Sequence, residues 1–201
     1  MMKKTLLAAA ALCALTSGAA MAQNYPQDGK WMVRARAVHL DSANKDSTPL
    51  DLSVNNKMIP ELDISYFFTP NFAAELILTY PQKHDVRAGG AEIGSLKHLP
   101  PTLLAQYHFT NLGAFKPYVG AGINYTRFSS VDILGGALNV KKNSFGPALQ
   151  VGFDYALDKN WSINFDVKKV YIKTDVRSFG TKVGTFKVDP VLVGVGLGYR
   201  F

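Results

Sequence analysis

The sequence has almost no cysteine and no long apolar run in its main part. Its one cysteine among 201 residues is Cys13, within the first 22 residues. After residue 22, no apolar stretch approaches the roughly 20 residues that a membrane-spanning helix requires. The rest of the chain therefore has neither a disulfide framework nor a helical membrane anchor. With 47% hydrophobic and only 18% charged residues, it is also too apolar to be disordered, and one compact domain is expected.

The first 22 residues have the three parts of a secretory signal peptide. Lys3 and Lys4 form a positive start, residues 6–15 form an apolar segment, and Ala20-Met21-Ala22 is a small-x-small cleavage site. Cleavage is predicted between Ala22 and Gln23, which leaves residues 23–201 as the folded domain.

From residue 30 onward, apolar and polar side chains alternate in segments of about ten residues, as in strands with one apolar face. The eight segments are Lys30–Leu40, Met58–Phe68, Asn71–Tyr80, Leu99–Phe109, Pro117–Phe128, Ser144–Tyr155, Trp161–Thr174 and Lys187–Phe201. Short connections (69–71, 110–116, 156–160) alternate with long ones (41–57, 81–98, 129–143, 175–186). Lipid cannot satisfy a free strand edge, so the sheet must close. The prediction is an all-β fold: an eight-stranded antiparallel transmembrane β-barrel with short periplasmic turns and four longer extracellular loops.

One face of these segments collects the ionisable side chains. A cation facing lipid at mid-depth would cost about 2–4 kcal/mol, so this face is expected to point inward. A lipocalin-type soluble barrel would have the opposite polarity, with its apolar face inside. The predicted polar network of the lumen is Arg34, Arg36, Glu61, Asp63, Glu75, Gln106, Asp154, Asp166, Lys168 and Arg200. Eight strands leave room for side chains alone, so a structural plug is the simpler interpretation and a polar constriction for passage is the alternative.

The chain ends on Phe201, with Tyr199 and Leu197 two and four positions before it. This spacing is similar to the C-terminal signal by which outer-membrane barrels are delivered to the barrel-assembly machinery. We therefore expect insertion into the outer membrane of a Gram-negative bacterium.

Several motifs resemble the OmpW family of outer-membrane proteins. They are LDISYFFT (62–69), KHD (83–85), GSLKHLPPTL (94–103), KPYVGAGINYT (116–126) and GLGYRF (196–201). The resemblance covers essentially all of residues 23–201. It implies a barrel that admits small hydrophobic molecules, as in alkane-uptake relatives of the AlkL type. It also implies an apolar pocket near the extracellular end that opens sideways to the bilayer, and no cofactor.

Candidate wall residues of that pocket lie near the extracellular strand ends and in the first long connection. They are Val38, Leu40, Leu50, Leu52, Val54, Met58, Leu99, Leu104, Val170 and Ile172, and ordinary packing is the alternative interpretation of each. Pro60, Pro100, Pro101 and Pro147 lie in or beside strands, where a missing N–H donor would weaken the wall. Lys168-Lys169 stands where some family members have an aromatic pair, so a tight hydrophobic constriction is not expected at that height.

Two other functions are alternatives to transport. Of His39, His84, His98 and His108, only His84 and His98, which flank one long connection, could approach each other, and Ser95 or Asp85 could complete a hydrolytic set. Nothing in the sequence fixes that geometry, and two histidines without a third ligand or a metal-binding spacing do not make a metal site. Neither catalysis nor a metal site is expected. A surface receptor or a structural envelope protein is the main alternative, because basic residues of the loops could hold lipopolysaccharide phosphates. These residues are Lys141, Lys142, Lys173, Arg177, Lys182 and Lys187, too dispersed for nucleic acid.

Overall fold

The structure is a computed structural model that describes residues 29–201. The predicted signal peptide and its cleavage site after Ala22 lie outside the described residues. Within the described part, no helix is long and apolar enough to cross a membrane.

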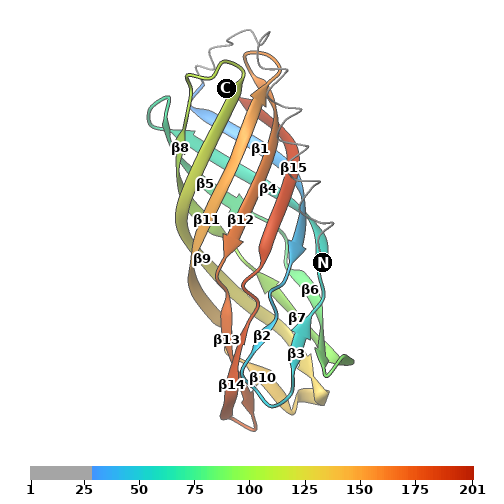
Figure 1. Ribbon diagram of the computed structural model, residues 1–201. Coiled ribbons are helices and arrows are strands. Elements are labelled where there is room, and N and C mark those ends of the chain that lie inside the picture. The colour runs from blue at the N-terminus through green and yellow to red at the C-terminus, as the bar shows by residue number, and fades with distance from the viewer. Residues whose placement is uncertain (1–28) are drawn as a thin grey trace, which may run out of the picture.

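Eight antiparallel strands form a closed barrel (Figure 1). They are β1 (Trp31–Asp41), β4 (Lys57–Phe67), β5 (Phe72–Leu78), β8 (Thr102–His108), β9 (Phe115–Ile133), β11 (Asn143–Ala156), β12 (Trp161–Val170) and β15 (Val191–Arg200). Neighbouring strands pair in the order β11-β12-β15-β1-β4-β5-β8-β9, and pairing of β9 with β11 closes the ring. The predicted fold class is confirmed.

The long connections continue the barrel wall as further β-structure rather than as irregular loops. Hairpins form from β6 (Gln82–Ala88) with β7 (Ala91–Leu99) and from β13 (Lys173–Ser178) with β14 (Thr181–Lys187). Short strands β2 (Lys45–Asp46), β3 (Leu52–Val54) and β10 (Leu138–Val140) and the 3₁₀ turn Leu134–Gly136 complete this extension. In Figure 1 it forms the lower end of the molecule. Two predicted boundaries are therefore wrong: the segment 161–174 is divided between β12 and β13, and Lys187 belongs to β14 instead of the last strand.

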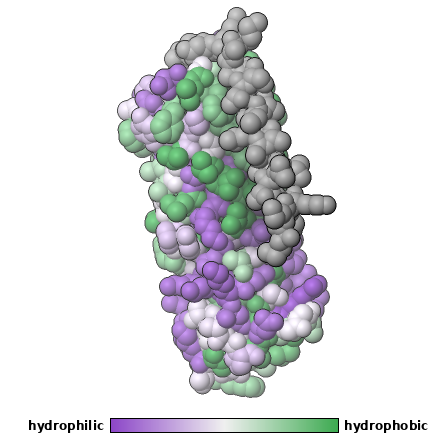
Figure 2. Space-filling model, viewed as in Figure 1, coloured by the Kyte–Doolittle hydropathy of each residue, from purple (hydrophilic) through white to green (hydrophobic). Residues whose placement is uncertain are grey.

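The outer face of the barrel is apolar and ends in aromatic rings. At the periplasmic end Trp31 packs on Tyr66, and Trp161 packs on Tyr199, each with ring centroids 4.8 Å apart. Figure 2 shows hydrophobic side chains over the barrel strands and hydrophilic ones predominating over the extension. Such a band bounded by aromatic side chains suits the hydrocarbon layer and its two interfaces.

Backbone pairing at the C-terminus closes the barrel at its periplasmic end. The N–H of Trp31 donates to the carbonyl of Phe201 at 3.0 Å, and the N–H of Phe201 donates to the carbonyl of Trp31 at 2.8 Å. The last residue is thereby part of the ladder between β15 and β1. Its predicted role as an insertion signal stays a prediction.

Candidate functional site

The predicted polar network lies inside the barrel. All ten of its side chains are buried, and none is more than 7% exposed. Strand alternation places them there, since every second residue of a strand points to the same face. Arg34 and Arg36, for example, alternate with the outward Val33, Ala35 and Ala37 on β1.

Arg34 joins three strands at the centre of this network. Its Nε and Nη2 donate to the two carboxylate oxygens of Asp154 at 3.1 and 2.7 Å. Its Nη1 reaches Oε1 of Glu75 at 3.0 Å and the hydroxyl of Ser65 at 2.9 Å. The guanidinium also lies 5.4 Å from the ring centroid of Tyr118. Such a bidentate, multiply bonded arginine fixes the positions of its partners.

Arg36 and Lys168 extend the network toward the extracellular side. Arg36 lies 2.5 Å from Asp63, 2.7 Å from Glu75 and 2.9 Å from Asp166. Lys168 Nζ lies 2.5 Å from Glu61 and 2.9 Å from Asp166. Each of the five carboxylates of the network is therefore within ion-pair distance of at least one of its three cations.

Side-chain amides complete the network, and one of them was missed from the sequence. Gln106 Nε2 donates to Glu75 and to Oε1 of Gln150, both at 2.8 Å. Gln150 Nε2 donates to Glu75 at 2.9 Å and to Asp166 at 2.7 Å. The inward register of Gln150 was the signal that could have found it. We call Arg34, Arg36, Glu61, Asp63, Glu75, Gln106, Gln150, Asp154, Asp166 and Lys168 the polar plug.

Other buried polar side chains were also missed, and one predicted member lies apart from the plug. Tyr118 and Asn164 are fully buried and bonded to each other at 3.0 Å, and Lys116 is 7% exposed. Arg200 lies at the periplasmic end, where its Nε donates to the carbonyl of Gly29 at 2.6 Å and its guanidinium stacks on Phe67.

An apolar cluster fills the extracellular half of the interior, on the extracellular side of the plug. Its buried members include Val38, Leu40, Leu52, Val54, Ile59, Ile77, Val86, Leu96, Leu104, Phe128, Val170, Ile172 and Leu192. Seven of the ten predicted pocket residues are in it, and Leu50 packs against it partly buried. Met58 does not belong there: it is 61% exposed, because its neighbour Ile59 takes the inward register of β4. Leu99 is half-buried on the face opposite the inward His98.

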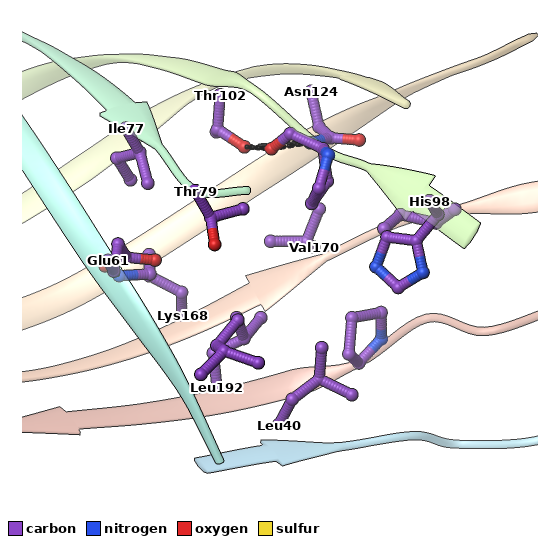
Figure 3. A pocket seen from close by; sticks show the side chains of 14 residues that line it. Leu40, Glu61, Ile77, Thr79, His98, Thr102, Asn124, Lys168, Val170 and Leu192 are labelled. Carbon is purple, nitrogen blue, oxygen red and sulfur yellow. Dashed lines mark hydrogen bonds and ion pairs between the residues drawn. The ribbon is translucent and has the colours of Figure 1, made fainter. Parts of the chain in front are cut away.

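A pocket lies where the apolar cluster meets the plug (Figure 3). Its apolar wall consists of Leu40, Ile59, Ile77, Val170, Ile172, Leu192, Pro100 and Pro190, and its polar lining of Glu61, Thr79, His98, Thr102, Asn124 and Lys168. In Figure 3, His98 lies at one end and Glu61 with Lys168 at the other. The open space is about 20 Å³, which is room for about one water molecule.

Two stacked histidines lie beside this pocket, on the β6–β7 hairpin beyond the ends of β5 and β8. The rings of His84 and His98 are 4.7 Å apart and 13° from parallel. Burial lowers the pKa of His84, while burial together with His84 and Lys57 lowers the pKa of His98 to about 3. Both rings are therefore neutral at physiological pH.

The histidines do not form the hydrolytic or metal-binding sets considered from the sequence. Asp85 and Ser95 pair with each other across the hairpin, on the face opposite His84. His39 points outward, and His108 is bonded to Gln106 in the barrel. In residues 29–201, no three His, Cys, Asp or Glu side chains are placed to hold a metal ion.

The barrel wall is interrupted next to the pocket. Pairing of β5 with β8 ends at Ile77 and Thr102, and pairing of β6 with β7 resumes at Gln82 and His98. Residues 78–81 and 99–101, which we call the seam, have no register partners across this gap in the described sheet. Three of them are prolines without an N–H donor, namely Pro81, Pro100 and Pro101.

Asn124 on β9 holds one side of the seam by side-chain hydrogen bonds. Its Nδ2 donates to the carbonyls of Pro100 and Pro101 at 3.1 and 3.2 Å and to the hydroxyl of Thr102 at 2.8 Å. Pro147 keeps its register opposite Ile123. Pro60 is paired with Ala37 on β1, but on its other side the pairing of β4 with β5 stops at Leu62 and Leu78. Of the four prolines singled out in the sequence, Pro60, Pro100 and Pro101 therefore lie at an interruption of the wall.

Curated relatives of the chain are outer-membrane proteins. An uncharacterized outer-membrane protein, y4mB of Sinorhizobium fredii, is 48% identical over 182 residues, covering 85% of this chain and 80% of that protein. Outer membrane protein W of Vibrio cholerae is 34% identical over 220 residues, covering both chains completely. The dibenzothiophene metabolism operon protein PahQ of Pseudomonas aeruginosa is 29% identical over 176 residues, covering 82% of this chain and 80% of that protein.

Solved structures and a family model agree with these relatives. OprG of Pseudomonas aeruginosa superposes with a TM-score of 0.75 at 28% identity, covering 88% of this chain and 97% of that one. AlkL, solved in lipid bilayers, superposes with a TM-score of 0.68 at 25% identity, covering 88% and 92%. The model of the OmpW family matches residues 27–201. The chain is an outer-membrane β-barrel and belongs to the OmpW family.

Proposed function

We propose that the protein lets small hydrophobic molecules cross the outer membrane passively, through the pocket and sideways through the seam into the bilayer. The observation that carries this proposal is the position of the pocket. It lies next to the polar plug, on its extracellular side. Residues from both sides of the seam line it, namely Ile77, Thr79, His98, Pro100 and Thr102. The plug obstructs an axial route, whereas the seam residues have no register partners across the gap in the described sheet.

Relatives with named roles support a hydrophobic solute. The printed name of PahQ connects that protein to the metabolism of dibenzothiophene, a flat apolar molecule. AlkL is among the structures most similar to this chain, in line with the alkane uptake that the family resemblance implies.

A solute must displace side chains to enter, because the open space is only about 20 Å³. The residues on the extracellular side of the pocket are mainly Leu, Ile and Val, which hold one another by dispersion contacts rather than by hydrogen bonds. The cluster can therefore repack around a solute without leaving polar groups unpaired.

Uptake in cells tests the proposal. Uptake of labelled octane is compared between cells without the protein, cells with the natural chain and cells with Val170→Trp, which fills the pocket. Val193→Trp, on the outer face of β15, is the matched control because Val193 is 38% exposed toward lipid. We expect faster uptake with the natural chain and the control, and loss of this gain with Val170→Trp. Equal rates in all strains would refute the function, and a fully active Val170→Trp variant would refute the route.

A further inference from the structure

The base of the β6–β7 hairpin contains three buried polar atoms without a hydrogen-bond partner in the described structure. They are Oε1 of Gln82 and the Nε2 atoms of His84 and His98. Gln82 and His98 are register partners, and His84 stacks on His98, so the three side chains form one group. None of the three residues is more than 2% exposed. Buried polar atoms without partners are rare in proteins, and each requires an explanation.

Two of these atoms are hydrogen-bond acceptors that lack a donor. The amide nitrogen of Gln82 donates to the hydroxyl of Thr79 and to the carbonyl of Tyr80, which leaves Oε1 as an acceptor without a donor. His84 Nδ1 lies 3.0 Å from the carbonyl of Asn55, so Nδ1 carries the hydrogen and Nε2 is an acceptor. This part of the interior therefore has an excess of acceptors.

The donors that line the pocket are already in use. The hydroxyl of Thr79 donates to the carbonyl of Pro60, and the hydroxyl of Thr102 donates to the carbonyl of Pro100. Asn124 is bound to the seam, and Lys168 to Glu61 and Asp166. Of the unpartnered group, only His98 lines the pocket, where its ring faces the apolar wall (Figure 3). A molecule that enters the pocket must therefore bring its own hydrogen-bonding group to satisfy Nε2 of His98.

We propose that the pocket selects apolar molecules that carry one hydroxyl group, with a medium-chain primary alcohol as the model ligand. This inference rests on the proposed function and specifies its substrate class. The hydroxyl binds Nε2 of His98, and the alkyl chain lies against Leu40, Val170 and Leu192. A hydroxyl both donates and accepts, so it fits either neutral form of the imidazole.

Other head groups fit less well. An alkane leaves Nε2 of His98 unpaired, and an ether or ketone brings acceptors only. An ionised carboxylate would lose its hydration in a pocket that already contains the carboxylate of Glu61, and the one cation of the described lining, Lys168, already has two anionic partners. The expected preference is alcohol over alkane by about 3- to 10-fold, the usual net effect of one hydrogen bond, with the carboxylate last.

A binding experiment tests this directly and does not depend on transport. The protein, labelled with ¹⁵N in its histidine rings, is placed in lipid nanodiscs and titrated with 1-octanol, octane or octanoate at equal mole fractions in lipid. We expect a saturable shift of the His98 nitrogen resonance with octanol only. His39, which points outward, controls for effects of the solute on the bilayer. No shift at His98, or equal shifts with octane and octanol, would overturn the proposal and leave water as the partner of this atom.

Uptake measurements then separate this proposal from the proposed function. His98→Phe should reduce the ratio of octanol to octane uptake about 3- to 10-fold, whatever its effect on the absolute rates. His98→Gln, which can still hydrogen-bond, should keep the ratio, as should the control His39→Phe. An unchanged ratio in His98→Phe, with both solutes still taken up faster than in cells without the protein, refutes the substrate class alone. If the natural chain accelerates the uptake of neither solute, the proposed transport function is refuted. The nanodisc titration then still decides whether the pocket binds alcohols.

Discussion

Replacing Arg36 by methionine tests whether ion pairs hold the plug together. Methionine keeps most of the side-chain length and removes the charge. In the natural chain the guanidinium lies within 3.0 Å of Asp63, Glu75 and Asp166. Glu75 and Asp166 would keep Arg34 and Lys168 as partners. Asp63 would keep none, because Arg36 is its one cationic partner in the described ion pairs.

The expected destabilisation follows from the burial of that carboxylate, which is 0% exposed. Removing one member of a buried ion pair costs about 3–5 kcal/mol, since the other charge stays buried without a partner. This corresponds to a decrease of about two to four powers of ten in the folding equilibrium constant. Replacing both members by uncharged groups is often close to neutral. Arg36→Met combined with Asp63→Asn should therefore recover at least half of the loss.

Urea unfolding in lipid vesicles measures both effects. Trp31 and Trp161 report insertion by fluorescence, because they are 47% and 46% exposed at the membrane end of the barrel. A gel-mobility shift on heating confirms that each variant forms the barrel. A cost below about 1 kcal/mol for Arg36→Met, or a double variant in which the two losses simply add, would show that packing rather than charge pairing holds the plug.

Three further predictions concern the wall, the plug and the hairpin. Gly122→Ala should destabilise the barrel by more than about 2 kcal/mol, because a Cβ there would lie 2.0 Å from the carbonyl oxygen of Leu103. Gly194→Ala should cost less than half as much in the same unfolding assay, because the new Cβ would lie 3.2 Å from a methyl group of Val38 and its three nearest atoms all belong to side chains. A double-mutant cycle of Glu61→Gln with Lys168→Met should give a coupling energy of at least about 1 kcal/mol, and additivity would contradict the ion pair. The unfolded hairpin binds a proton at His98 below its ordinary pKa of 6.5, whereas the folded hairpin does so only near 3. His98 should therefore make stability fall between pH 6.5 and 3 by about 1.4 kcal/mol per unit. His98→Gln should reduce the slope measured by hydrogen exchange of residues 82–99 and leave the contribution of His84, whose pKa is also lowered.

The barrel and most of its plug were predictable because strand alternation has a period of two. Because lipid excludes charge from the outer face, the side chains of Arg34, Arg36 and Asp63 must point into the barrel. The same rule shows why Met58 was wrongly placed in the pocket. It has the same parity as Leu62, which lies on the apolar outer face, and Ile59 occupies the inward position instead.

The extension and the seam were not predictable in the same way. The two extracellular hairpins contain register shifts, at Val86/Arg87 and Val176/Arg177, which break the period of two that marks a strand. The sequence indicated that His84 and His98 could approach each other. Their stacking, and the absence of donors around them, depend on pairing across the hairpin that no local pattern specifies.

The relative cost of the two routes favours sideways release over passage along the barrel axis. An axial solute would have to separate Arg34 from Asp154 and Arg36 from Asp63, and each buried pair that is broken costs about 3–5 kcal/mol. At the seam, residues 78–81 and 99–101 have no register partners across the gap in the described sheet, and the bonds of Asn124 that hold one side of it are neutral hydrogen bonds of about 0.5–1.5 kcal/mol each. A solute that leaves there also passes directly into hydrocarbon and never meets the charged lumen. On the proposed route, the plug therefore stays intact while an apolar molecule leaves through the wall beside the pocket.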